Sequence, residues 1–183
     1  MSREHGHFVS TRKQAERVIN RHKRFWISDC GCRVRLGRKC RRSRVDVCLS
    51  FSDPGPKGAS GGGGAKKVTR AFVDALLRHA EEKHLICQPF HFGPSGGAQG
   101  VCFCCDDCCF LFNPKPMPYN KGTLIERTDK AVCIHCGKCA NVCFFGARRM
   151  KGKKLAVKRA LCSGCGLCVD VCPSDAVTMV KRD

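Results

Sequence analysis

The hydrophobic pattern near the start of the chain predicts a short amphipathic helix. Ala15 and Ile19 lie one helical turn apart, with mainly polar residues between them. Just before them, Thr11 and Gln14 stand at the spacing of a capping box, in which each side chain satisfies a backbone amide at the helix start. The pattern therefore predicts a helix over about residues 12–24.

A second helical pattern covers residues 67–84, where Val73 and Leu77 belong to a broad apolar stripe of the kind that faces a core. Between the two helices, the apolar run 25–27 predicts a strand. The glycine-rich residues 53–66 favour a loop, because glycine adds backbone freedom and no side chain that can pack. These elements predict a small α+β module in the first part of the chain.

Eight cysteines near the C-terminus have the spacing of a metal-cluster ligand set and not that of a packed core. The two runs are Cys133-x2-Cys136-x2-Cys139-x3-Cys143 and Cys162-x2-Cys165-x2-Cys168-x3-Cys172-Pro173. Three thiolates separated by two residues each can wrap around one [4Fe-4S] cubane, and in this pattern the fourth cysteine ligates the neighbouring cluster. The spacing thus assigns Cys133, Cys136, Cys139 and Cys172 to cluster 1, and Cys162, Cys165, Cys168 and Cys143 to cluster 2.

Zinc and disulfides are the alternatives for these eight cysteines. A tetrahedral zinc ion is complete with four ligands, which leaves the doubled four-cysteine order unexplained. Disulfides are disfavoured because the N-terminus lacks the apolar segment of an export signal, so that a reducing, cytoplasmic location is expected. No apolar run approaches the roughly 20 residues of a membrane span, and we expect a soluble protein.

The two cysteine runs form an internal repeat, and residues 121–183 resemble a bacterial-type ferredoxin with two [4Fe-4S] clusters. The resemblance implies a small (βαβ)2 domain of the α+β class that carries electrons. The first repeat departs from the family at Phe144, where the family usually has proline. The resemblance therefore carries over the family's chain path after Cys172 and not after Cys143.

Ten further cysteines lie before residue 112 in two groups. The sparse group comprises Cys30, Cys32, Cys40 and Cys48, and the dense group comprises Cys87, Cys102, Cys104, Cys105, Cys108 and Cys109. Five cysteines within eight residues exceed what packing needs, and the arginine-rich stretch 33–44 would stabilise thiolate anions. A working partition gives each group its own centre, for one or two additional iron–sulfur clusters or zinc. Packed thiols and redox-active cysteines remain the alternatives for the sparse group.

The C-x-C-R and C-x-C-C segments, together with the ferredoxin-like end, make the whole chain similar to cysteine-rich, multi-cluster iron–sulfur proteins of anaerobic microbes. The expected organisation is a cysteine-rich module over 1–112, a proline-rich linker over 113–122 and a two-cluster domain over 123–183. His5 and His7, in the polar N-terminal segment, are assigned no role.

The formal net charge of +19 favours a redox protein partner with an acidic docking face. Nucleic acid is a less favoured partner, because the chain has one Trp, one Tyr and no recognisable nucleic-acid-binding signature. Basic residues near the C-terminal ligands are expected to raise the cluster potentials. They are Lys138, Arg148, Arg149, Lys158 and Arg159.

The sequence favours an electron carrier, or a small electron-relay subunit of a redox complex. The alternative is a redox enzyme, or a metal or redox sensor, whose N-terminal cysteines form the active or sensing site fed by the ferredoxin-like domain. No catalytic residue is assigned, because the sequence shows no nucleophile–base pair and residues 61–64 lack the lysine of a phosphate-binding loop.

Overall fold

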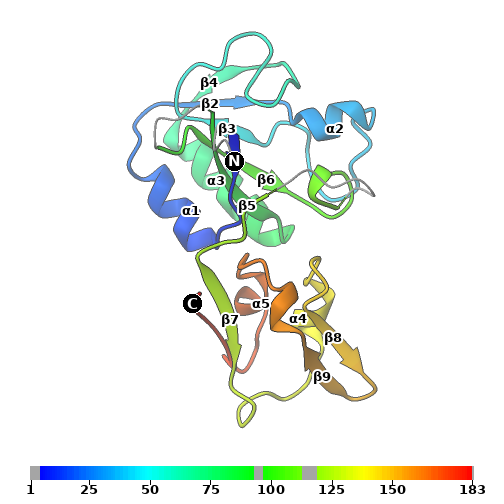
Figure 1. Ribbon diagram of the computed structural model, residues 1–183. Coiled ribbons are helices and arrows are strands. Elements are labelled where there is room, and N and C mark those ends of the chain that lie inside the picture. The colour runs from blue at the N-terminus through cyan, green and yellow to red at the C-terminus, as the bar shows by residue number, and fades with distance from the viewer. Residues whose placement is uncertain (1–4, 93–96, 113–118, 183) are drawn as a thin grey trace.

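The computed structural model describes residues 5–92, 97–112 and 119–182, and these residues form two parts (Figure 1). The first part contains a six-stranded sheet and three helices. Its elements are β1 (His5–His7), α1 (Arg12–Ile19), β2 (Phe25–Ser28), α2 (Gly31–Arg35), β3 (Cys48–Ser50), β4 (Lys66–Val68), α3 (Arg70–Glu82), β5 (Ile86–Phe92) and β6 (Gly100–Cys104). A short 3₁₀ turn, Phe110–Phe112, follows β6.

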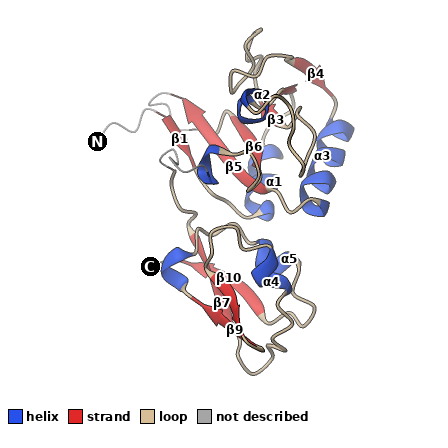
Figure 2. Ribbon diagram, turned by 90° about the vertical axis from the view of Figure 1, so that its right-hand side faces the viewer, coloured by secondary structure: helices blue, strands red, loops and turns tan. Residues whose placement is uncertain are grey.

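The sheet has the order β1-β5-β6-β3-β2-β4, and all its neighbouring strands are antiparallel. Helices α1 and α3 lie together against one face of it, as Figure 2 shows. Their apolar stripes meet the inward residues of the strands, and Ile27, Leu49, Val73 and Phe103 are all fully buried in this core. The sheet therefore supplies a rigid base beneath the cysteines on β3 and β6 and in the loops beyond them.

The two helices predicted in the N-terminal part are present as α1 and α3, and both are shorter than the sequence pattern predicts. The capping box is complete: the Thr11 hydroxyl accepts from the Gln14 amide, and the Gln14 side chain accepts from the Thr11 amide. Helix α1 ends at Ile19 because the polar residues that follow turn the chain toward β2, where His22 stacks on Phe51 with ring centroids 3.8 Å apart.

The second predicted helix, α3, begins at Arg70 and not at residue 67, because Lys66–Val68 pair with β2 as strand β4. Thr69 then caps the helix by accepting a hydrogen bond from the Phe72 amide. The apolar run 25–27 forms strand β2 as predicted. Residues 53–65 contain turns and bends without helix or strand, in agreement with the expected glycine-rich loop.

The second part of the structure consists of two small antiparallel sheets and two short helices. Its elements are β7 (Leu124–Thr128), α4 (Lys138–Asn141), β8 (Arg148–Lys151), β9 (Lys154–Val157), the 3₁₀ turn Arg159–Leu161, α5 (Leu167–Asp170) and β10 (Val177–Lys181). The element order is strand, helix, strand in each repeat, but the strands pair across the repeats: β7 with β10, and β8 with β9. The mixed helix-and-strand class is thus confirmed, and the two halves are joined by their own hydrogen-bonded ladders.

An apolar cluster joins the two parts. Its members include Val9, Ile86, Cys104, Cys109, Phe112, Tyr119, Val142, Phe144, Phe145, Cys165 and Leu167. Polar contacts flank it: the Arg12 guanidinium lies 3.3 Å from the Asp170 carboxylate, and the Tyr119 and Ser163 hydroxyls are 2.9 Å apart. The second part is therefore packed against the first in this structure.

Within the described residues, none of the helices has both the length and the apolar character that a membrane span requires.

Candidate metal centres

Two pockets in the C-terminal part divide the eight cysteines of the repeat between them. Site 1 is lined by Cys133, Cys136, Cys139 and Cys172, together with apolar side chains that include Leu155 and Val177. Site 2 is lined by Cys143, Cys162, Cys165 and Cys168, with Val142 and Phe145 among its walls. Each pocket takes three cysteines from one repeat and one from the other. This grouping matches the one predicted from the spacing, while the role of each cysteine as a ligand stays a prediction.

The two sites differ in exposure. Cys136 of site 1 is exposed, and the neighbouring Ile134 is 64% exposed. In site 2, Cys162 and Cys168 are buried, and burial raises the pKa of Cys165 and of Cys168 to about 12. Buried neutral thiols in a largely apolar pocket are suited to metal coordination, which deprotonates them and stabilises the resulting charge.

Glycine is required where the cysteine loops turn sharply. Gly137 and Gly166 occupy equivalent places before α4 and α5, with φ angles of 79° and 80° in the left-handed region. At Gly164, φ is 85° and an added Cβ would lie 2.3 Å from the carbonyl oxygen of Leu124. A side chain there would collide with β7, so this turn in the loop of site 2 depends on glycine.

Arg148 lies between the two sites and is 2% exposed. It donates one hydrogen bond from Nη1 to Cys139 Sγ at 3.3 Å, and its Nη2 contacts Glu126 Oε2 and donates to Thr128 Oγ1 at 2.6 Å. Burial, the largest influence, lowers its pKa, but electrostatic interactions with Cys168 and Glu126 and the hydrogen bond to Cys139 outweigh burial and raise the pKa overall.

The other basic residues predicted to act on the clusters lie at the surface. Lys138, Arg149, Lys158 and Arg159 are all exposed. Of these, Arg159 reaches Glu126 Oε1 at 3.6 Å. Nothing in the sequence separates these four residues from Arg148. In the structure, Arg148 differs from them because it is buried and donates an N–H···S hydrogen bond to Cys139.

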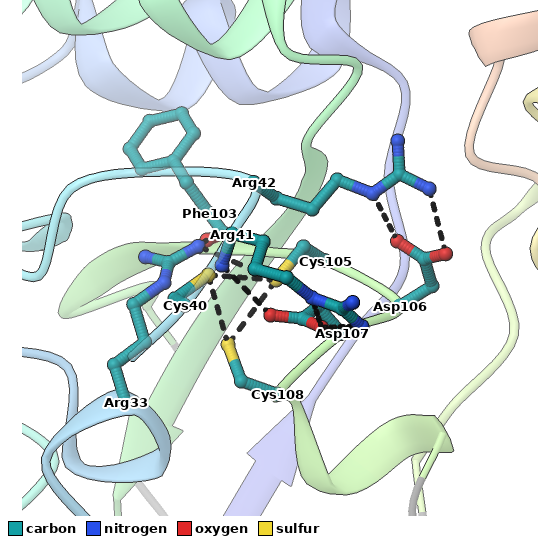
Figure 3. A network of polar contacts seen from close by, with 9 residues as sticks. All are labelled: Arg33, Cys40, Arg41, Arg42, Phe103, Cys105, Asp106, Asp107 and Cys108. Atoms are coloured by element: carbon teal, nitrogen blue, oxygen red, sulfur yellow. Dashed lines mark hydrogen bonds and ion pairs between the residues drawn. The ribbon is translucent and has the colours of Figure 1, made fainter. Parts of the chain in front are cut away.

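In the N-terminal part, three sulfurs form a compact triad. Cys40 Sγ is 3.6 Å from Cys105 Sγ and 3.4 Å from Cys108 Sγ, and the last two are 3.2 Å apart (Figure 3). The hydrogen bond between Cys105 and Cys108 is the largest of several effects that lower the pKa of Cys105 to about 5, and the same bond raises the pKa of Cys108. Among the described residues, these three sulfurs lie close enough together to bind one metal ion.

A second set of sulfurs lines a cavity of about 340 Å³. The cysteines in its wall are Cys30, Cys32, Cys102, Cys104 and Cys109. A hydrogen bond with Cys32 is the main reason that the pKa of Cys30 is raised, and a hydrogen bond with Cys109 does the same for Cys32. Cys109 is in turn hydrogen-bonded to Cys104. Four sulfurs from two distant segments thus line one cavity and influence one another's pKa.

His7 also belongs to this cavity, although the sequence assigned it no role. Strand β1 pairs with β5 at the edge of the sheet, and this pairing brings His7 Nε2 to 3.9 Å from Cys102 Sγ. Burial, followed by the charge of His91, lowers the pKa of His7 and so favours the neutral imidazole that can ligate a metal. Nothing in the linear sequence connects His7 with a cysteine so far along the chain.

The structure groups the N-terminal cysteines differently from the working partition. The sparse and dense groups are not separate in space, because each set of neighbouring sulfurs includes cysteines from both groups. Cys48 is opposite Cys102 in the pairing of β3 with β6, and their sulfurs are 3.7 Å apart. Cys87 lies in the main core, 2% exposed among the apolar residues there, and burial raises its pKa to about 12. Cross-strand pairing, which spacing alone does not reveal, decides these neighbours.

Comparison with known families identifies the C-terminal part. Residues 127–179 match the family described as the 4Fe-4S dicluster domain. This part is therefore a ferredoxin-type 4Fe-4S domain, and with the many cysteines it supports an iron–sulfur electron-transfer role for the protein. The search of curated proteins found no match to the chain.

Proposed function

We propose that this protein is an iron–sulfur electron carrier, or a small electron-relay subunit of a redox complex, with two [4Fe-4S] clusters in a (βαβ)2 ferredoxin-type domain. Cluster 1 is held by Cys133, Cys136, Cys139 and Cys172, and cluster 2 by Cys162, Cys165, Cys168 and Cys143. The observation that carries the proposal is the pair of pockets in which those same two sets of four thiols meet. Four sulfur donors with apolar surroundings suit a cubane, whose iron atoms each take one thiolate.

The apolar cluster between the two parts supports a relay between them. It contains Cys165 of site 2 together with Cys104 and Cys109 of the N-terminal cavity. Phe144 packs edge-on against Phe112 across this cluster, with ring centroids 6.3 Å apart. Side chains packed in direct contact provide a path for an electron between the two parts. Under this proposal, the N-terminal part holds at least one further metal centre, and cluster 2 exchanges electrons with an iron–sulfur cluster bound by the cysteines of the N-terminal cavity.

Cluster 1 is proposed as the point of exchange with a partner protein. Site 1 has the exposed Cys136 and the exposed apolar Ile134 beside it. The formal charge of +19 favours a redox partner that presents an acidic face. The rate of electron exchange with such a partner should therefore fall as ionic strength rises.

Anaerobic purification followed by iron and sulfide analysis tests the assignment of the two clusters. The wild type should contain at least about eight irons and show EPR signals of two reduced clusters that interact magnetically. Serine substitution of Cys139 should remove one cluster, and serine substitution of Cys168 should remove the other. Colourless protein that contains zinc in place of iron would refute the proposal.

A redox enzyme or sensor is the second candidate function, and the N-terminal cavity is the observation that favours it. The cavity of about 340 Å³ has five cysteines and His7 in its wall, and Phe90 and Leu111 provide apolar surface. An iron–sulfur cluster held there by Cys30, Cys32, Cys104 and Cys109 would leave room for a small molecule. Substrate-dependent oxidation of the dithionite-reduced protein, abolished in Cys32→Ser, would support an enzyme. Failure of candidate substrates and anions to change the EPR spectrum of such a cluster would argue for a simple relay.

We also propose that the chain is divided into a cysteine-rich module over 1–112, a linker over 113–122 and a two-cluster domain over 123–183. The high cysteine content favours a reducing, cytoplasmic location. Residues 113–118 of the expected linker lie outside the described residues. Limited proteolysis of the holo-protein would test the boundary, since cleavage inside 113–122 should release a brown C-terminal fragment.

A further inference from the structure

The Cys40, Cys105 and Cys108 triad has the dimensions of a site for one metal ion. Its three Sγ–Sγ distances are 3.2, 3.4 and 3.6 Å. Ligands at about 2.3 Å from a tetrahedral zinc ion are separated by about 3.8 Å, close to these values. Thiolates on different irons of a cubane stand much farther apart. No sulfur–sulfur contact of this kind links the eight cysteines of sites 1 and 2, all of which lie within the described residues.

The backbone around the triad is held in place by two arginine–aspartate ion pairs, of which Arg42–Asp106 is bidentate. Cys105 and Cys108 flank a turn whose central residues are Asp106 and Asp107. Arg42 contacts the Asp106 carboxylate at 2.6 and 2.8 Å, and Arg41 contacts Asp107 through its guanidinium and its backbone amide (Figure 3). These pairs attach the Cys105–Cys108 turn to the segment that carries Cys40. The sulfurs are therefore brought together by structure outside the triad itself.

A buried cation faces the triad. Arg33 is 1% exposed, and its Nη2 donates to the Phe103 carbonyl at 3.2 Å and to Cys105 Sγ at 3.6 Å. Its Nε and Nη1 are buried without a hydrogen-bond partner among the described residues, and none of the described ion pairs involves it. A buried charge is costly unless an opposite charge compensates it. Three thiolates on a divalent ion carry one net negative charge, which matches the single positive charge of Arg33.

We propose that Cys40, Cys105 and Cys108 bind one divalent thiophilic metal ion, zinc, with Arg33 as its buried charge partner and solvent in the fourth position. This proposal deepens that of an additional metal centre in the N-terminal part, and it does not depend on the two C-terminal clusters. Binding releases the three thiol protons to solvent and involves no change of oxidation state. The ion joins the loop before β3 to the turn after β6, so its main effect is to stabilise this end of the sheet.

Metal analysis of the full-length holo-protein, purified anaerobically from zinc-supplemented medium, tests the site. The wild type should contain one zinc per chain in addition to its iron. Cys40→Ser and Cys108→Ser should each lose the zinc, whereas the matched control Cys32→Ser, in the neighbouring sulfur set, should retain it. Arg33→Gln should keep the ligands but weaken zinc binding at least tenfold in competition with a chelator, since the charge partner is removed.

Cobalt substitution and EPR make the outcomes distinguishable. Co²⁺ in the zinc site should show thiolate-to-cobalt charge transfer and the visible bands of a tetrahedral ion, and both should be absent in Cys40→Ser. Zinc retained in Cys40→Ser would overturn the proposal, as would additional iron that is lost in that variant. The EPR signals of the C-terminal clusters should be unchanged in all these variants and show that the C-terminal part is folded. The fluorescence of Trp26, the single tryptophan of the chain, should also be unchanged and show that strand β2 and the N-terminal sheet are intact. Loss of those signals in the wild type would instead refute the proposed electron-transfer function.

Discussion

Arg148 should set the reduction potential of cluster 1, and replacing it with glutamine should lower that potential. The substitution removes a buried positive charge and the 3.3 Å hydrogen bond from Nη1 to Cys139 Sγ. Both interactions stabilise the extra negative charge of the reduced cluster, so their loss makes reduction less favourable. Because Arg148 also lies within the electrostatic influence of Cys168, cluster 2 should shift in the same direction.

The size of the shift follows from Coulomb's law. A unit charge at roughly 6 Å from the centre of the cluster contributes about 2.8 kcal/mol at an effective dielectric constant of about 20. For a one-electron couple this energy corresponds to about 120 mV. The lost hydrogen bond from Arg148 to the Cys139 sulfur acts in the same direction.

Protein-film voltammetry at constant pH measures the shift, and two further variants control for other causes. Arg149→Gln removes the neighbouring but exposed charge and should change the potential much less, because solvent screens it. Glu126→Gln combined with Arg148→Gln removes both members of the buried pair and should restore part of the potential. Arg148→Gln alone leaves Glu126 buried without its partner, which costs about 3–5 kcal/mol of stability. The double variant avoids this cost and so separates the change in potential from a loss of stability. Equal shifts in Arg148→Gln and Arg149→Gln would refute the reasoning.

Replacing Cys172 with serine should remove the same cluster as replacing Cys133, so the double variant should contain as much iron as either single variant. Additive iron loss would contradict the exchange of ligands between repeats. Phe144→Ala should reduce stability by about 1–2 kcal/mol, because half-buried aromatic surface is lost between the two parts, and a thermal melt of the holo-protein would detect it. Thr11→Ala should cost about 1 kcal/mol through loss of the capping box. Thr69→Ala, which removes the single capping bond of α3, should have a smaller effect on the same melt, and the opposite order would contradict this account.

Local elements followed closely from the sequence because their causes are local. The Thr11 capping box forms as its spacing predicts, and the apolar stripe of α3 faces the core. The boundaries were less predictable. Lys66–Val68 extend the helical pattern in sequence, but β2 offers an unpaired edge, and the backbone hydrogen bonds of strand β4 satisfy it.

Phe144 shows how tertiary structure explains a departure seen in the sequence. The residue stands where the ferredoxin family usually has proline, and the structure places its ring between the two parts of the molecule. Its partners are Phe112 and the Arg42 guanidinium, whose Cζ lies 5.0 Å from the ring centroid. Proline is too small and too rigid to make these contacts. The aromatic residue is therefore accounted for by the N-terminal part, which the family's pattern does not contain.

By itself, the sequence determined the chemistry of the C-terminal part, because a cysteine repeat of fixed short spacing constrains which sulfurs can share a cluster. It also determined that the N-terminal cysteines exceed what a core requires. Only the tertiary structure decided which of them are neighbours: Cys40 meets Cys105 and Cys108, while Cys87 is buried in the main core. Contacts between distant segments depend on strand order and cross-strand register, which local spacing does not specify. For the same reason only the fold separates the buried Arg148 from the exposed Arg149, two adjacent residues of one type that point to opposite sides of strand β8.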